Sequence, residues 1–169
     1  MSKMTVVKNY ILDAAVADKK LRRIALEIIE NNAGTEELIL AGIRDNGSAI
    51  ARILQGIIAE YSPVKTVLID LSLDKRTPRA IELNQSLNFD HKTIIVVDDV
   101  ANSGKTLLYA MKPFLEYQPA RIQTAVLVGR SHNSFPVYPD YVGLSIATTL
   151  QEHIFVEVEE GKVRGAYLA

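Results

Sequence analysis

Apolar positions follow two spacings along this chain, and each spacing predicts one kind of element. Over residues 18–31 and 47–61 the apolar side chains recur every three or four positions, which is typical of amphipathic helices. Unbroken apolar runs rich in Val and Ile predict buried strands. The expected helices are residues 18–31, 47–61 and 104–117, and the expected strands are residues 37–42, 64–71, 94–97 and 121–129. Strands that alternate with helices predict an α/β fold with a parallel sheet and right-handed crossovers.

The C-terminal quarter has a different pattern, with three short runs that predict strands. These runs are residues 141–146, 153–158 and 163–168. Residues 159–162 predict a hairpin turn, and together with the N-terminus this region is expected to form a small cap over the sheet. Pro113 is expected to kink the third helix or to end its regular part. The length suits one domain over residues 1–169, in which the polar stretch 72–90 is expected to be mobile.

Composition and charge narrow the class of protein. Hydrophobic residues make up 48% of the chain, charged residues 23%, and the formal net charge is −1, so the chain has no overall basic character that would attract nucleic acid. No apolar run approaches the roughly 18 residues that span a bilayer, and no signal-peptide core is seen. The absence of cysteine excludes disulfides and thiolate metal sites. We therefore expect a soluble cytoplasmic protein without a membrane partner.

The candidate chemistry is concentrated in residues 94–106, which read I-I-V-V-D-D-V-A-N-S-G-K-T. Asp98 and Asp99 follow the four apolar residues of a strand, and Gly104 lies in a polar turn before a helix that opens at Thr106. Parallel sheets bind ligands beyond the carboxyl ends of their strands, and the free N–H groups at a helix start attract phosphate. The two carboxylates repel phosphate and suit hydroxyl groups or a magnesium-bridged part of the same ligand. The string therefore predicts a site for a phosphorylated sugar.

Two other interpretations fit parts of this string. A Walker A loop requires a glycine five residues before Gly104, and Asp99 stands there, so that nucleotide-binding loop is excluded. The other interpretation is a buried strand, an Asp-rich turn and a helix N-cap that bind no ligand. Aspartate pairs at strand ends are common, so the two aspartates alone leave this interpretation open. The whole string of residues 94–106 favours a ligand site.

The same string resembles the 5-phosphoribosyl 1-pyrophosphate (PRPP) signature of the type I phosphoribosyltransferases. This resemblance implies that Asp98 and Asp99 are the catalytic acids that hold the ribose hydroxyls, while the loop binds the 5′-phosphate. The implied phosphate-binding residues are Ala101, Asn102, Ser103, Gly104, Lys105 and Thr106. Family members that act on 6-oxopurines have an aspartate where Asn102 stands, and that aspartate handles the proton on purine N7. Because asparagine cannot act as that base, the sequence argues against hypoxanthine and guanine.

Other segments resemble one branch of the family, the bifunctional pyrimidine-operon attenuation regulators with uracil phosphoribosyltransferase activity. The segments that carry this resemblance are residues 21–32, 42–51, 125–132 and 136–146. It implies transfer of ribose 5-phosphate from PRPP to uracil, giving UMP and pyrophosphate through an oxocarbenium-like transition state. It also implies a type I phosphoribosyltransferase fold with a small hood and a homo-oligomer of two or more copies. Mg²⁺ would be held through PRPP, with Asp98 and Asp99 as the protein groups able to reach it.

The branch also implies where the pyrophosphate and the base would lie. The implied pyrophosphate loop consists of Ile43, Arg44, Asp45, Asn46 and Gly47. The family pattern has a lysine at the position of Arg44 and an arginine at that of Asn46, so this loop has less positive charge here. Val142 and Ile146 stand where the family holds the base, and their backbone groups are expected to read the uracil edge.

The lid of the uracil-transferring members corresponds to the segment after the 64–71 strand. This segment is shorter here, and Leu73 stands where the family has an arginine. Closure of such a lid excludes water and brings positive charge to the leaving pyrophosphate. The arginine is expected to be replaced from a shifted position by Lys75, Arg76 or Arg79. The alternative is a crippled lid and low turnover.

RNA binding by this branch requires a basic surface, because phosphate neutralisation dominates affinity for nucleic acid. The basic residues that would contribute to it here are Arg22, Arg23, Arg130 and His132. Other positions that are basic in RNA-binding relatives are occupied by Asn133, Tyr138 and Leu144. Two alternatives to uracil transfer therefore stay open. One is a regulator that senses PRPP or a pyrimidine nucleotide, and the other is a phosphoribosyltransferase for another nucleobase.

Overall fold

The computed structural model describes residues 5, 7–78, 80–147 and 152–169, and a six-stranded sheet forms its centre. In spatial order the strands are β4 (Glu82–Leu83), β3 (Lys65–Ser72), β2 (Glu37–Ile43), β5 (Thr93–Ala101), β6 (Arg121–Arg130) and β7 (Tyr141–Ile146). All neighbours are parallel except the short edge strand β4, which is antiparallel to β3. The predicted α/β fold with a parallel sheet is confirmed.

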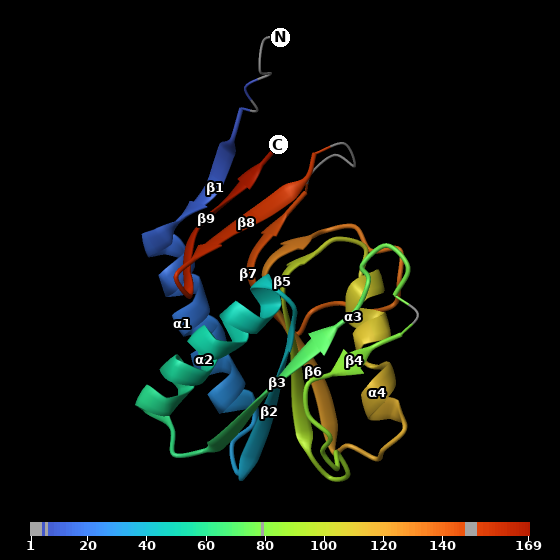
Figure 1. The fold of residues 1–169 in the computed structure, drawn as a ribbon. Coiled ribbons are helices and arrows are strands. Elements are labelled where there is room, and N and C mark those ends of the chain that lie inside the picture. Colours follow the sequence, from blue (N-terminus) through green and yellow to red (C-terminus); the bar gives the residue numbers. More distant parts are fainter. Residues whose placement is uncertain (1–4, 6, 79, 148–151) are drawn as a thin grey trace.

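Helices and loops cover both faces of this sheet (Figure 1). On one face lie α1 (Ala14–Asn31) and α2 (Asn46–Tyr61), whose apolar sides join the sheet in one buried cluster. On the other face α3 (Lys105–Ala110) and α4 (Lys112–Leu115) pack with the segment before β5 in a second cluster. The aromatic rings of Phe89 and Phe114 meet edge-to-face in this second cluster, 4.9 Å apart.

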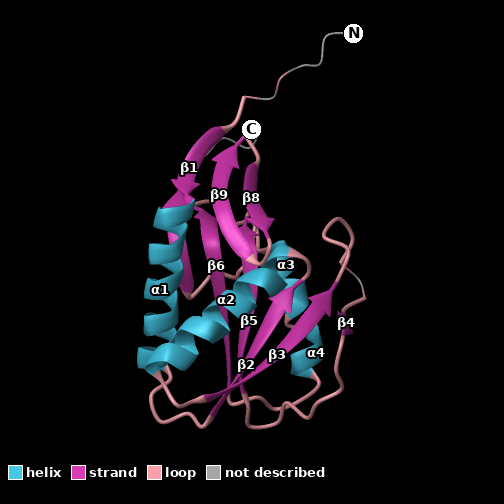
Figure 2. Cartoon of the chain, turned by 60° about the vertical axis from the view of Figure 1, so that its left-hand side comes forward, coloured by secondary structure: helices cyan, strands magenta, loops and turns pink. Residues whose placement is uncertain are grey.

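A second, three-stranded sheet lies at the carboxyl ends of the parallel strands, and we call it the hood. It consists of β1 (Asn9–Asp13), β9 (Lys162–Leu168) and β8 (Ile154–Glu159), paired antiparallel in the order β1-β9-β8. Figure 2 shows the hood above the main sheet, with the C-terminal end of the chain on that side. Glu160 and Gly161 take positive φ angles of 51° and 72° in the hairpin turn between β8 and β9.

Three elements differ from the sequence expectation. β7 belongs to the main sheet rather than to the cap, because it pairs in parallel with β6 from Ala125↔Tyr141 to Arg130↔Ile146. The first helix starts at Ala14 instead of residue 18, since the Asp13 carboxylate accepts a hydrogen bond from the Val16 N–H and caps it. The helix expected over residues 104–117 is divided at Met111 into α3 and α4, with Pro113 in the first turn of the second piece.

The segment 72–90 contains some fixed structure. Within it β4 pairs with β3, and Asn84 accepts a hydrogen bond from the Asp70 N–H at 2.9 Å. Nothing in the described residues forms a helix long and apolar enough to cross a bilayer.

Candidate active site

The acid pair, Asp98 and Asp99, lies in the second half of β5, beneath the hood. Asp98 is buried, with 1% of its surface exposed, and Asp99 is half-buried. Each carboxylate accepts a hydrogen bond from the next backbone N–H, Asp99 N to Asp98 Oδ1 and Val100 N to Asp99 Oδ1, both at 2.8 Å. These short local bonds fix both carboxylates at the strand end, where ligands of parallel sheets bind.

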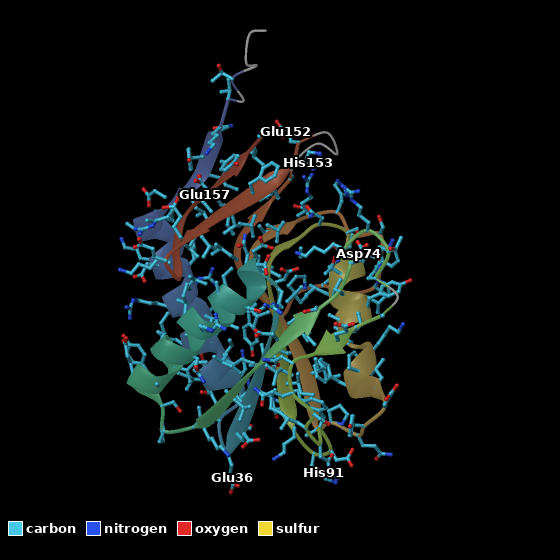
Figure 3. All side chains as sticks on the ribbon, in the orientation of Figure 1. Glu36, Asp74, His91, Glu152, His153 and Glu157 are labelled. Carbon is cyan, nitrogen blue, oxygen red and sulfur yellow. The ribbon has the colours of Figure 1, made fainter. Side chains whose placement is uncertain are left out.

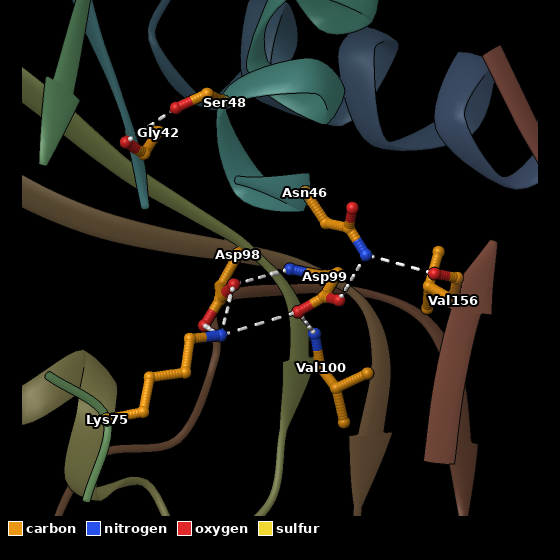
Figure 4. A network of polar contacts seen from close by, with 8 residues as sticks. All are labelled: Gly42, Asn46, Ser48, Lys75, Asp98, Asp99, Val100 and Val156. Atoms are coloured by element: carbon orange, nitrogen blue, oxygen red, sulfur yellow. Dashed lines mark hydrogen bonds and ion pairs between the residues drawn. The ribbon is translucent and has the colours of Figure 1, made fainter. Parts of the chain in front are cut away.

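Lys75, from the predicted lid, reaches this pair directly (Figure 4). Its Nζ lies 3.2 Å from both oxygens of Asp98 and 3.7 Å from Asp99 Oδ1. Burial, followed by the negative charge of Asp99, raises the pKa of Asp98 to about 8, although Lys75 opposes the shift. Burial also disfavours the ammonium form of Lys75, but the charges of the two aspartates outweigh it and raise the pKa of Lys75. Lys75 therefore keeps its charge at neutral pH, and Asp98 holds a proton more readily than an exposed aspartate.

Asn46 connects the acid pair to the hood. Its Nδ2 donates to Asp99 Oδ2 at 3.0 Å and to the backbone oxygen of Val156 in β8 at 2.9 Å. Asn46 is the first residue of α2, so the start of that helix, the end of β5 and the hood meet at one amide group. Figure 4 shows Asn46 on one side of the acid pair and Lys75 on the other.

The loop implied for pyrophosphate packs tightly at its ends and is open in its middle. Ile43 and Gly47 are buried, whereas Arg44 and Asp45 are exposed and joined by a cis peptide bond. A Cβ atom on Gly47 would lie 2.5 Å from the backbone oxygen of Val97, so only glycine permits this approach to β5. The loop therefore leaves Arg44 exposed, two residues before the start of α2.

The implied phosphate loop is a tight turn supported by the chain that follows β6. Gly104 has φ +87°, and a Cβ atom there would lie 2.8 Å from the backbone oxygen of Val137. The backbone oxygen of Ser103 accepts from the N–H groups of Ser134 and Phe135 at 3.0 and 3.1 Å. A small cavity of about 60 Å³ lies over this loop, lined by Lys75 and residues 100–107. The structure thus brings the loop, Lys75 and the acid pair together.

A larger cavity of about 330 Å³ adjoins the same loop. Its lining residues are Asn102, Ser103, Arg130, Ser131, His132, Ser134 and His153. Arg130 Nε donates to Asn102 Oδ1 at 2.8 Å, and Arg130 also donates to the backbone oxygen of Glu152. Since arginine only donates, this contact turns the Asn102 oxygen toward Arg130 and leaves the amide nitrogen as the group to face a ligand.

Arg130 and His132, which were expected on an RNA-binding surface, both line this cavity. His153 lies just before β8 at the top of the hood in Figure 3, and the sequence analysis missed it. Nothing in its local sequence indicated a site, because its place depends on how the hood folds over the sheet.

The residues expected to bind the base have carbonyl groups that already accept hydrogen bonds. Val142 O accepts from Arg23 Nη2 at 3.0 Å, and Ile146 O accepts from both the N–H and the hydroxyl of Ser131. Val142 O thus keeps a second lone pair, whereas Ile146 O already accepts two hydrogen bonds. Val142 is also in contact with the second buried cluster, which gives it a role in packing.

Two of the remaining cationic residues, Arg22 and Arg23, are bonded to groups outside the acid pair. Arg23 is bonded to β7 and to Glu27, and Arg22 pairs with Asp18 and Glu60, so neither guanidinium is free of acidic partners. Arg76 is exposed, and Arg79 lies outside the described residues.

The acid pair offers two carboxylates as oxygen ligands for a cation. Two carboxylates suit a hard cation such as Mg²⁺, and no cluster of three or more His, Cys, Asp or Glu occurs in the described part of the chain. The donor set therefore fits a metal held mainly by its own substrate rather than by a protein cage.

Comparisons with known proteins agree with this geometry. A family model described as phosphoribosyl transferase domain matches residues 9–160. The bifunctional protein PyrR of Clostridium novyi (strain NT) is 36% identical over 163 residues, covering 90% of this chain and 92% of that protein. The protein of the same name from Haemophilus ducreyi is 33% identical, covering 90% of this chain and 91% of that protein.

Solved structures share the fold at lower identity. Hypoxanthine phosphoribosyltransferase of Trypanosoma cruzi aligns with a TM-score of 0.78 at 15% identity, covering 95% of both chains. Hypoxanthine-guanine phosphoribosyltransferase of Bacillus anthracis aligns with a TM-score of 0.71 at 20% identity, covering 89% of this chain and 87% of that one. The matched family model and the PyrR relatives place this chain in the phosphoribosyl transferase domain family.

Proposed function

We propose that this chain transfers the ribose 5-phosphate unit of PRPP to uracil, releasing UMP and pyrophosphate. One observation carries the proposal: Lys75 contacts Asp98 and also lines the cavity over the phosphate loop. Because one side chain touches both, the acid pair and the phosphate loop lie within the reach of a single sugar phosphate. The PyrR relatives support a pyrimidine base as the acceptor.

Different residues would bind the ribose, the 5′-phosphate and the base. Asp98 and Asp99 accept hydrogen bonds from the ribose hydroxyls, and the backbone amides of residues 101–106 bind the 5′-phosphate with the hydroxyls of Ser103 and Thr106. The Ser103 Oγ accepts from the Lys105 N–H at 3.3 Å, so its proton remains available to a phosphate oxygen. The 330 Å³ cavity beside the loop receives the base.

Asn102 and Arg130 would set the preference for the base. The Asn102 amide nitrogen, turned toward the cavity by Arg130, donates to a carbonyl oxygen of uracil. A purine that presents a ring N–H at this point would meet a donor instead of an acceptor, which disfavours its binding. This arrangement favours a pyrimidine with exocyclic oxygens.

In the reaction the bond between ribose C1 and the pyrophosphate oxygen breaks while a bond from uracil N1 to C1 forms, and the N1 proton passes to the released pyrophosphate or to water. The positive charge that develops on the ribose lies near Asp98 and Asp99, which stabilise it electrostatically. Bound Mg²⁺, held by PRPP and the acid pair, would supply neutralisation of the diphosphate charge. Arg44 and Lys75 are the cations of this chain that would face the leaving group.

We further propose that the active form is a homo-oligomer and acts in the cytoplasm. A pyrimidine-sensing regulator is the second candidate, because the relatives are named bifunctional proteins. Against an RNA-binding version, Arg22 and Arg23 are each already paired with a carboxylate. Salt-dependent titration of pyrimidine leader RNA tests it, since phosphate contacts make affinity fall with salt.

The proposed activity is tested by titrating PRPP with Mg²⁺ into the protein by calorimetry and then adding uracil and detecting UMP. The double variant Asp98→Asn/Asp99→Asn is expected to lose PRPP binding, and Asp18→Asn on α1 serves as a surface control that keeps it. UMP formed by the control and the wild type supports uracil transfer. PRPP binding without UMP moves the function to a sensor or another base, and a base panel separates those two. No PRPP binding by wild type contradicts the proposal.

A further inference from the structure

All four oxygens of the acid pair are engaged by groups of the protein itself. Lys75 Nζ contacts both oxygens of Asp98 and lies 3.7 Å from Asp99 Oδ1, while Asn46 donates to Asp99 Oδ2. Figure 4 shows these contacts closing around the two carboxylates. A ligand hydroxyl that approaches these oxygens therefore meets groups that already bond to them, and at Asp98 that group is the Lys75 ammonium.

Lys75 is the contact best suited to replacement. Its side chain is 47% exposed, although its ammonium group lies against a carboxylate that is 1% exposed. Asn46, by contrast, is built into the start of α2 and is also bonded to the hood. Displacing Lys75 returns an ammonium group to water, whereas displacing Asn46 would disturb two elements.

The turn that carries Lys75 is bonded to itself. The Asp74 carboxylate accepts from the Arg76 N–H at 2.9 Å and from the Thr77 hydroxyl at 3.4 Å. The turn thus keeps its shape without the contact of Lys75 to the acid pair. It can therefore leave the acid pair without losing these internal bonds.

Lys75 also occupies the space between the two halves of the proposed sugar site. It lines the small cavity over the phosphate loop while its ammonium group is bonded to Asp98. A ribose 5-phosphate with its phosphate on the loop and its hydroxyls on the acid pair would have to pass through that space. The ammonium group and the ribose hydroxyls therefore compete for the same oxygens.

We propose that Lys75 is an internal occupant of the ribose site, which holds the turn 74–77 on the acid pair in the ligand-free protein and is displaced when a sugar phosphate binds. This inference rests on the proposed function, since it takes the acid pair to be the ribose site. It makes sugar-phosphate binding and release of the lid turn one event.

Calorimetric titration with ribose 5-phosphate, which lacks the diphosphate, tests the competition. Lys75→Met removes the competing charge and is expected to bind ribose 5-phosphate about tenfold more tightly than wild type, equivalent to about 1.4 kcal/mol. Lys75→Arg keeps the cation and is expected to stay close to wild type. Lys65→Met removes an exposed lysine that pairs with Glu37 at the far end of β3 and is expected to change nothing.

The outcomes separate the two proposals. If wild type binds ribose 5-phosphate or PRPP and Lys75→Met binds no more tightly, the internal occupant is refuted while the proposed site stands. If no protein of the series binds either compound, both proposals are overturned. If Lys75→Met binds ribose 5-phosphate more tightly than wild type and the other two variants do not, the proposal that Lys75 is an internal occupant is supported.

Tryptic cleavage of the wild-type protein, with and without ligand, gives a second readout. Saturating ribose 5-phosphate is expected to speed cleavage after Lys75 and Arg76 severalfold in the wild type, because the displaced turn can enter the protease. In Lys75→Met, cleavage after Arg76 should already be fast without ligand. Unchanged cleavage of the ligand-bound wild type at these two bonds would refute the displacement.

Discussion

At the scale of single residues, the site depends on a buried carboxyl group with an unusual proton affinity. Asp98 is enclosed in β5 beside a second carboxylate, and one lysine faces them both. One cation cannot neutralise two buried anions, so a proton on Asp98 completes the balance, in agreement with its raised pKa of about 8. Burying the proposed ribose-binding oxygens therefore lowers the stability of the fold, and this cost grows as the pH rises toward about 8.

This cost predicts that the free energy of unfolding falls as the pH rises from about 4 to about 8. Over that window the folded Asp98, with its pKa of about 8 instead of 3.8, keeps a proton that the unfolded chain has released, so the folded state loses stability with rising pH. Below the window both states are protonated, and above it both are ionised. Urea unfolding at about pH 5, 7 and 9 measures the slope. Asp98→Asn, which cannot titrate, should be less sensitive to pH, and an identical slope would contradict the assignment.

Local sequence could indicate part of this site and not the rest. Asp98, Asp99 and the loop to Thr106 are consecutive, so their chemistry was visible in one string. The contact of Lys75 with Asp98 spans 23 positions, and that of Asn46 with Val156 spans 110. Such pairings depend on how the elements pack, and no residue spacing shows them.

At the scale of elements, the start of α2 is positioned by a close approach to β5. Gly47 has no side chain, and that lets the helix start lie against the backbone of Val97 and Asp98. Gly56, near the middle of the same helix, would meet nothing within 4 Å if it carried a Cβ. The two glycines therefore separate the effect of crowding from that of helix propensity.

Gly47→Ala is expected to lower the free energy of unfolding by about 1–3 kcal/mol, because the new methyl group overlaps backbone atoms that cannot move freely. Gly56→Ala should raise it by about 0.5–1 kcal/mol, since alanine is the better helix former in open space. Denaturant unfolding of both variants tests the pair. If PRPP binding is measured in parallel, only the Gly47 variant should weaken it, because the shift displaces Asn46. Equal effects of the two substitutions would argue against crowding.

The sequence predicted the order of strands and helices along the chain more readily than it predicted which strands pair with one another. Alternating apolar runs and amphipathic segments predicted the parallel sheet, and the strand order β3-β2-β5-β6 agrees with it. The run at β7 resembles the hood strands in length and alternation, so its pattern alone did not show that it pairs with β6. Pro113 indicated the break in the third helix, because its ring cannot sit in a helix interior.

At the scale of the whole molecule, the hood and the main sheet are joined at the proposed site. β8 and β9 contribute Val156, Val163 and Ala166 to the buried cluster beneath α1 and α2. The polar link is the Asn46 amide, which connects Asp99 to the backbone of Val156. Because one group serves both contacts, the position of the hood and the orientation of Asp99 are coupled.

Substitution of Asn46 tests this coupling. Asn46→Ala removes two hydrogen bonds and is expected to destabilise the protein by about 1–3 kcal/mol. Asn46→Asp should cost more, because it places a third carboxylate beside Asp98 and Asp99 and cannot donate to Val156. Amide hydrogen exchange should quicken in β8 of both variants before it quickens in β5, since β8 loses its polar link while β5 keeps neighbours on both sides. Asn9→Ala, on the exposed edge strand of the hood, is the control. If exchange in β8 is as slow in Asn46→Ala as in the control, the hood is held by apolar packing alone, and the coupling to Asp99 is refuted.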